Sequence, residues 1–208
     1  MRLHAAVILS MLLPPIVHVQ TMPDRQFRDG TLVSKVDPPV KLEINKTFQY
    51  AGKQEIDIFK VAGAEQYFFV DATPDSTIRR FIWVQFEHYY DNNNNIYDYS
   101  GIKQQSVQFD SIEFMGDISV VPDYFTSATR EGSDSKAGQQ FLRAKGFKID
   151  GTFVRLRLFH LPDTSRRKEL MIIYGESIQP DSQEKLIRSE IIQHAQENLK
   201  IEGDRQLH

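Results

Sequence analysis

Cysteine is absent from this chain of 208 residues. Its absence excludes disulfide bonds, thiolate metal sites, thiol catalysis and the lipidated N-terminal cysteine of bacterial lipoproteins. Exported eukaryotic domains commonly carry disulfides, so a cysteine-free exported chain would point towards a bacterium.

An excess of positive charge is absent as well. The chain has 25 Lys and Arg against 28 Asp and Glu, a formal net charge of -3, and an isoelectric point near 6.1. Proteins that bind nucleic acid need a basic surface that displaces counterions from the phosphates. We therefore expect no nucleic-acid partner.

Common enzyme and metal signatures are missing too. The chain has no H-E-x-x-H, G-x-S-x-G, G-x-G-x-x-G or Walker motif, and its two S-x-x-K matches, at 133–136 and 165–168, lack their companion motifs. The polar run 91–95 offers oxygen ligands, but Ile96 and Ile102 stand where a calcium-binding EF-hand needs Gly and Glu. We predict no cofactor and no metal.

The start of the chain has the pattern of an export signal. Arg2 precedes an apolar run at 5–17, which is shorter than the about 20 residues of a membrane span and is interrupted by Pro14 and Pro15. We predict that residues 1–21 are a cleaved signal peptide, and that the protein is periplasmic or extracellular with no stable membrane insertion afterwards. An uncleaved N-terminal anchor is the alternative.

The remainder predicts a single α+β domain. Residues 22–39 are rich in Asp, Arg and Pro and are expected to be a flexible lead-in, with the domain at 40–208. Alternating or β-branched apolar segments predict strands from residue 40 to 121, of which 80–90 is the strongest. Segments 151–161 and 168–177 predict a hairpin about the turn 162–165.

Two helices interrupt this β pattern. Ser133 or Asp134 can cap a short inserted helix at 134–145, and an apolar stripe repeating every four residues predicts an amphipathic helix at 182–200. The predicted fold class is α+β: a twisted, mostly antiparallel sheet of about seven to eight strands with the C-terminal helix packed on one face. A strongly curved sheet that closes on a pocket fits the same elements.

Two strands present faces that combine aromatic and hydrogen-bonding side chains. Strand alternation places Trp83, Gln85 and Glu87 on one face of the first, and Arg155 and Arg157 on one face of the second. If both faces line one cavity, it would suit a small polar or anionic ligand, because guanidinium groups grip carboxylate or phosphate. Alternatively, the arginines form cross-strand ion pairs with Glu87 or Glu169.

The function that these features favour is an exported, non-catalytic module that binds a small polar ligand or an envelope protein partner. An exported hydrolase is the alternative, with Glu87 or Glu176 acting together with His160 as an acid/base pair across strands. A purely structural envelope component is a third hypothesis.

Overall fold

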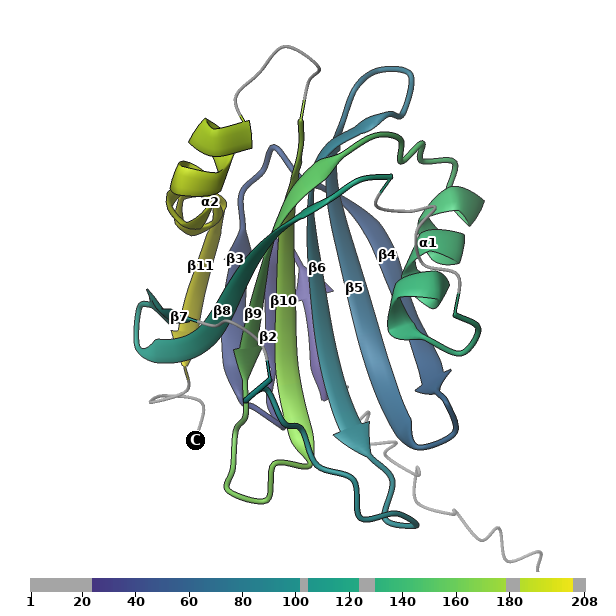
Figure 1. The fold of residues 1–208 in the computed structure, drawn as a ribbon, viewed down its shortest axis with the longest axis vertical. Helices are drawn as coiled ribbons and strands as arrows, with labels where there is room; N and C mark the ends of the chain where they lie inside the picture. Colours follow the sequence, from purple (N-terminus) through teal and green to yellow (C-terminus); the bar gives the residue numbers. More distant parts are fainter. Residues whose placement is uncertain (1–23, 102–104, 124–129, 179–183, 204–208) are drawn as a thin grey trace, which may run out of the picture.

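The computed structural model describes residues 24–101, 105–123, 130–178 and 184–203, so the predicted signal peptide lies outside the described residues. Its main element is a seven-stranded sheet in which all neighbouring strands are antiparallel (Figure 1). In spatial order the strands are β4 (Gln49–Ile58), β5 (Ala62–Ala72), β6 (Ile78–Tyr89), β10 (Lys168–Ser177), β9 (Phe153–His160), β8 (Ile112–Val121) and β7 (Gln105–Phe109). The predicted antiparallel α+β class is confirmed.

A second, four-stranded sheet covers one face of the first. Its order is β1 (Arg25–Arg28), β2 (Thr31–Ser34), β3 (Val40–Ile44) and β11 (Leu199–Gly203). The stretch 22–39 is thus not simply a flexible lead-in, because it contains β1 and β2. Asp29 and Gly30 join these strands with φ angles of 51° and 83°, as a two-residue hairpin turn requires.

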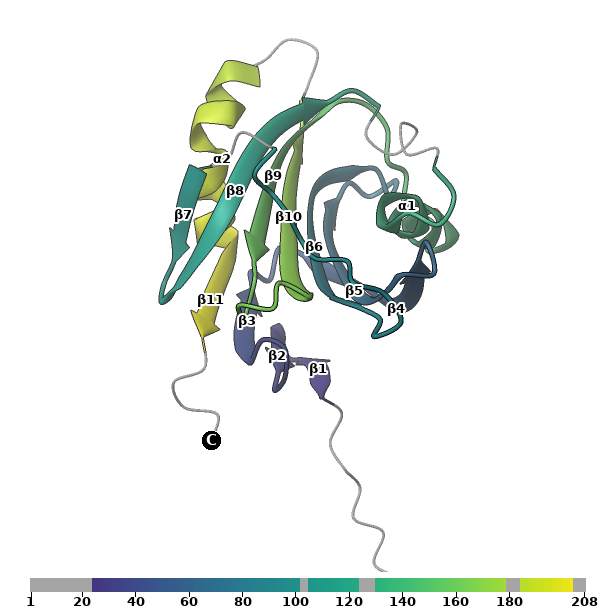
Figure 2. The ribbon, with the colours of Figure 1, turned by 60° about the horizontal axis from the view of Figure 1, so that its bottom comes forward.

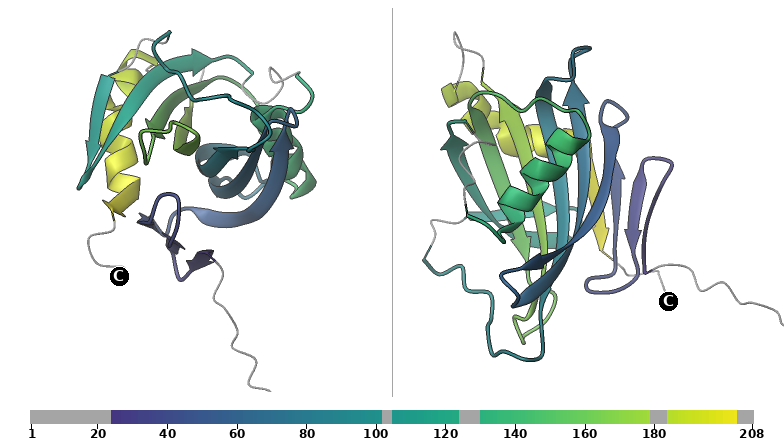
Figure 3. Two further views of the ribbon diagram at one scale, coloured as in Figure 1. Left: turned by 90° about the horizontal axis from the view of Figure 1, so that it is seen from below. Right: turned by 90° about the vertical axis from the view of Figure 1, so that its right-hand side faces the viewer.

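The seven-stranded sheet is buried on both faces. Figure 2 and Figure 3 show it curling at its β4–β6 half, with α1 (Asp134–Ala144) on the concave side and the four-stranded sheet with α2 (Glu184–Asn198) on the other. On β6, Ile82 and Val84 belong to the core shared with the four-stranded sheet, whereas Phe81 and Trp83 belong to the core on the α1 side. Burial on both faces explains why β6 is apolar along most of its length instead of alternating with polar residues.

The two helices match the predictions in kind, with shifted boundaries. Ser133 caps α1 by accepting a hydrogen bond from the Lys136 amide at 3.2 Å, as predicted. In α2, Ile191 and Ala195 are fully buried, but the helix ends at Asn198, and Leu199, expected to be helical, begins β11. Within the described part of the chain, neither helix is long and apolar enough to cross a membrane.

Candidate functional site

The five predicted ligand-binding residues lie on one face of the sheet. Trp83 of β6 is opposite Ile173 of β10, which is opposite Arg157 of β9, so these strands present the same face at that row. Strand alternation adds the other three, Gln85, Glu87 and Arg155, to that face, which is the one that α1 covers.

Trp83 serves mainly as a core residue. It is 1 % exposed, and its ring centroid is 5.2 Å from that of Phe68. Gly138 of α1 packs against it so closely that a Cβ there would lie 3.0 Å from a Trp83 ring carbon. The indole Nε1 is nevertheless buried without a hydrogen-bond partner among the described residues.

Gln85 belongs to a buried chain of amide side chains that crosses three strands. Gln54 donates to Gln66 at 2.6 Å, Gln66 donates to Gln85 at 2.8 Å, and Gln85 donates to Glu87 at 2.6 Å. Gln66 and Gln85 are fully buried. The chain satisfies groups that would be costly to bury alone, and it ends on the Glu87 carboxylate.

The two predicted arginines are engaged by β8. Arg157 makes a bidentate interaction with Asp117, at 2.8 and 3.0 Å, and Arg155 Nε donates to Ser119 Oγ at 3.1 Å. These are cross-strand interactions of the kind given as the alternative, although the acidic partner is Asp117, not Glu87 or Glu169. Because the Arg157 fork is occupied, the main reason for expecting an anionic ligand is weakened.

The structure does not bring the three predicted catalytic residues together. Glu87 lies on the α1 face, whereas Glu176 and His160 lie on the opposite face, near opposite ends of the β9–β10 pair. They line three different cavities, of about 750, 320 and 610 Å³ respectively. Glu176 instead accepts from the Tyr174 hydroxyl at 2.6 Å and lies 3.1 Å from His194 Nδ1.

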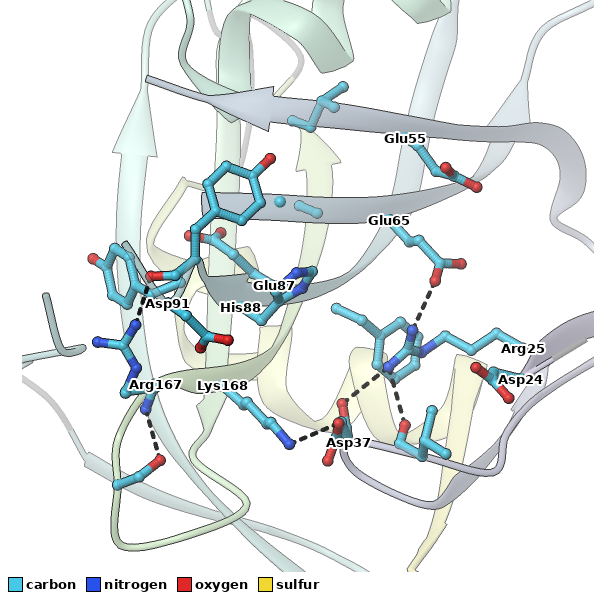
Figure 4. Close-up of a pocket in the computed structure, with 18 of the residues that line it drawn as sticks. Asp24, Arg25, Asp37, Glu55, Glu65, Glu87, His88, Asp91, Arg167 and Lys168 are labelled. Carbon is cyan, nitrogen blue, oxygen red and sulfur yellow. Dashed lines mark hydrogen bonds and ion pairs between the residues drawn. The ribbon is translucent and has the colours of Figure 1, made fainter. Parts of the chain in front are cut away.

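The 750 Å³ cavity lies where β5 and β10 begin and β6 ends, and β1 and the segment after β2 form its opposite wall (Figure 4). Gly63 lets the side chains of His88 and Tyr90 pack directly against the backbone in the cavity wall. A Cβ at this position would lie 3.1 Å from both His88 Cε1 and Tyr90 Cε1. The charged and histidine residues that line the cavity are Asp24, Arg25, Asp37, Glu55, Glu65, Glu87, His88, Asp91, Asp163, Arg167 and Lys168.

Arg25 is the most constrained cation of the cavity. Its guanidinium lies 2.7 Å from Glu65 and donates to the carbonyl oxygens of Val36 and Asp37 at 3.0 and 3.2 Å. The group also covers the Phe86 ring at 4.2 Å. Arg25 thereby attaches the β1 hairpin to the seven-stranded sheet, and its charge is compensated locally (Figure 4).

The other two cations are held in a similar way. Lys168 lies 2.8 Å from the Asp37 carboxylate, and Arg167 donates to the carbonyl oxygens of Tyr90 and Asn95 at 2.7 and 2.9 Å. Apart from Glu87, whose carboxylate points to the other side of β6, six carboxyl-bearing residues share the lining with these three cations, all three already engaged. The cavity has an acidic lining.

Glu87 lies between this cavity and the face of the sheet that α1 covers. Its backbone runs along the cavity wall, but its carboxylate points away from His88 to the other side of β6 (Figure 4). Burial raises the pKa of Glu87 to about 7, with a further increase from Asp134, while the nearby Tyr97 and Gln85 oppose the shift. Burial therefore favours the protonated form of this carboxyl group up to near neutral pH.

Sequence reasoning missed the residues that form most of the cavity. Arg25 and Asp37 lie in the stretch interpreted as a lead-in, and Glu65, His88 and Lys168 join them only through strand register. The dipeptide Asp29-Gly30, a strong hairpin signal, could have revealed the β1–β2 pair. The described residues contain no group of three or more His, Asp or Glu side chains that could hold a metal ion.

Comparisons with known proteins assign no family to this geometry. No protein-family model matches the chain, and searches of curated proteins and of solved structures find no significant match.

Proposed function

We propose that this protein is an exported, non-catalytic binding module that takes a small, positively charged polar molecule in the 750 Å³ cavity. The size suits a small-molecule ligand, since such sites usually measure about 300–1,000 Å³. Export rests on the N-terminal pattern, and the absence of a catalytic role rests on the separation of Glu87, Glu176 and His160.

The main support for a cationic ligand is that the positively charged side chains of the cavity already have partners, whereas some of its carboxylates are more available. Arg25, Arg167 and Lys168 are each held by a carboxylate or by carbonyl oxygens, so an anion would have to compete for them. Glu55 and Asp91 are exposed at the rim, and Glu55 has only Lys53, at 3.8 Å, as an ion-pair partner among the described residues. A cationic ligand would gain these carboxylates and would compete only with the exposed 3.8 Å pair of Glu55 with Lys53.

Aromatic surface supports the same ligand class. Tyr90 lines the cavity beside His88, with 5.9 Å between the ring centroids. The face of a tyrosine ring attracts ammonium and guanidinium groups. Carboxylates at the rim and a tyrosine on the wall are a combination that favours an organic cation over a neutral polar molecule.

The experiment is calorimetric titration of the purified protein with three probes of equal length: 1,4-diaminobutane, 1,4-butanediol and succinate. We expect saturable binding of the diamine only, with an affinity that falls as salt is raised. The double variant Glu55→Gln/Asp91→Asn should weaken binding about tenfold, as loss of about 1.4 kcal/mol predicts. Glu131→Gln, an 80 % exposed acid beside α1, is the matched control.

Failure of the diamine to bind, or tighter binding of succinate, would overturn the ligand class. Export is tested separately by mass spectrometry of the native protein, for which we expect an N-terminus between residues 18 and 23. An intact Met1 would contradict cleavage of the signal.

A further inference from the structure

The seven-stranded sheet ends at β4, a ten-residue strand with one free edge. Among the described strands β4 pairs only with β5, and it forms the right-hand edge of the sheet in Figure 1. In an antiparallel sheet, the backbone N–H and C=O groups of alternate residues point to opposite sides of the strand. Over residues 51–57 no described segment other than β5 takes the backbone groups of β4, so the outward groups are available to a partner.

The described elements beside β4 contact its inner face and its two ends. A Cβ at Gly52 would lie 3.0 Å from Phe141 Cζ, so α1 covers the face of the sheet there. Just beyond the strand, the Phe59 amide donates to the Gly132 carbonyl oxygen at 3.2 Å. The pairing of β4 with β5 is irregular only between Tyr50 and Gly52, so from Gly52 onwards the strand is a regular template for a further strand.

The side chains along this edge alternate in character. Lys53, Glu55 and Asp57 are exposed and share one face of the strand, whereas Gln54 and Ile56 are half-buried on the other. Lys53 and Glu55 carry opposite charges on either side of Gln54, and within one chain they lie 3.8 Å apart. The edge therefore presents a short charge pattern that changes sign about Gln54.

This pattern is complementary to itself in one register. A two-fold axis through a strand edge makes two copies antiparallel, and the residue on the axis lies opposite itself. With Gln54 on the axis, Lys53 of each copy lies opposite Glu55 of the other, and no like charges meet. An axis at Lys53, Glu55 or Asp57 places identical charges opposite each other, and an axis at Ile56 places Glu55 opposite Asp57, which is unfavourable.

We propose that the protein forms a two-fold dimer through β4, centred on Gln54, in which two seven-stranded sheets join into one continuous sheet. The outward backbone groups of the two strands satisfy each other, as in other cases of strand addition. The two Lys53–Glu55 pairs between the copies set the register. A second copy fits this edge better than an unrelated peptide because the sequence of charges along β4 supplies its own complement.

The dimer does not rest on the proposed ligand, although the two share one residue. Glu55 also lines the 750 Å³ cavity, so Lys53 of the second copy would compete with a cationic ligand for that carboxylate. Asp91 belongs to the cavity alone and stays available to the ligand. Failure of the diamine to bind would therefore leave the dimer unaffected, and a monomeric protein would leave the ligand proposal unaffected.

The absence of cysteine allows a direct test of the register. Opposite residues of an antiparallel pair have Cα atoms about 4.5–5.5 Å apart, which a disulfide can span, whereas diagonal neighbours at about 7–8 Å are too far apart. Under mild oxidation, an equal mixture of the Lys53→Cys and Glu55→Cys proteins should form a dimer linked between positions 53 and 55, identified by peptide mass mapping. Each variant alone should remain largely unlinked, because its cysteines are diagonal.

Sedimentation velocity over a series of protein concentrations measures the dimer itself. Lys53→Glu converts both pairs into like-charge contacts and should raise the dissociation constant at least about tenfold. The charge swap Lys53→Glu/Glu55→Lys recreates the complementarity and should restore dimerisation. Lys46→Glu, an exposed residue in the turn before β4 that changes the net charge equally, is the matched control, and Asp91→Asn should leave the dimer unchanged.

Three outcomes would overturn the proposal: a wild-type protein that stays monomeric at every concentration, cross-linking of either cysteine variant alone as efficient as that of the mixture, or equal effects of Lys53→Glu and Lys46→Glu. A charge swap that fails to restore the dimer would overturn the register. Circular dichroism and thermal melts establish that each variant is folded before it is tested.

Discussion

Replacing Glu87 by glutamine should make the folded protein less sensitive to pH. Folding raises the pKa of Glu87 from about 4.5 to about 7, chiefly through burial. The folded state therefore binds this proton more tightly than the unfolded state, so the free energy of unfolding falls as pH rises through that interval. A pKa difference of this size corresponds to a loss on the order of 3 kcal/mol by pH 8.

Glutamine keeps the size of the side chain and an oxygen that can accept from Gln85, but it cannot ionise. We expect urea unfolding of Glu87→Gln to give a flatter profile between pH 5 and pH 8, with the variant more stable than wild type at pH 8. It also removes the charge that raises the pKa of Glu169, which flattens the profile further. Exposed Glu131→Gln is the control, and parallel pH profiles for wild type and Glu87→Gln would refute the reasoning.

Two further predictions concern packing and charge. A Cβ at Gly175 would lie 2.2 Å from a Phe81 ring carbon, so Gly175→Ala should lower the free energy of unfolding by about 3 kcal/mol, measured in urea; a neutral effect would show that the ring moves aside freely. Asp117→Asn leaves the half-buried Arg157 without its ion pair and should cost about 2 kcal/mol, whereas adding Arg157→Met should restore part of that loss in a double-mutant cycle. Additive effects of the two substitutions would contradict the pairing.

Local patterns in the sequence predict the elements well because their causes are local. Lys168–Ser177 is a strand with the predicted boundaries, and Ser133 caps α1 because its hydroxyl reaches an amide three residues on. Leu199 shows where such reasoning stops. It continues the apolar stripe of α2, yet it lies in a strand because β3 offers it a pairing partner, Ile44.

Local patterns do not predict the cavity. Arg25, Asp37, Glu65 and Lys168 come together only because the β1 hairpin packs against the end of the seven-stranded sheet. Asp29-Gly30 could have revealed the hairpin in the stretch interpreted as a lead-in, but no local signal predicts what its side chains will meet. The engagement of Arg157 by Asp117 likewise depends on the β8–β9 register.

By itself, the sequence determined the antiparallel α+β class, the absence of disulfides and the common face of Trp83, Gln85 and Glu87, since composition and alternation depend only on the chain. The tertiary structure alone decided that both sheet faces are buried and that Glu87 lies opposite Glu169. It also decided that the 750 Å³ cavity has an acidic lining. The physical reason is that strand register and sheet stacking set which distant residues meet, and the meeting sets their ionisation and their binding chemistry.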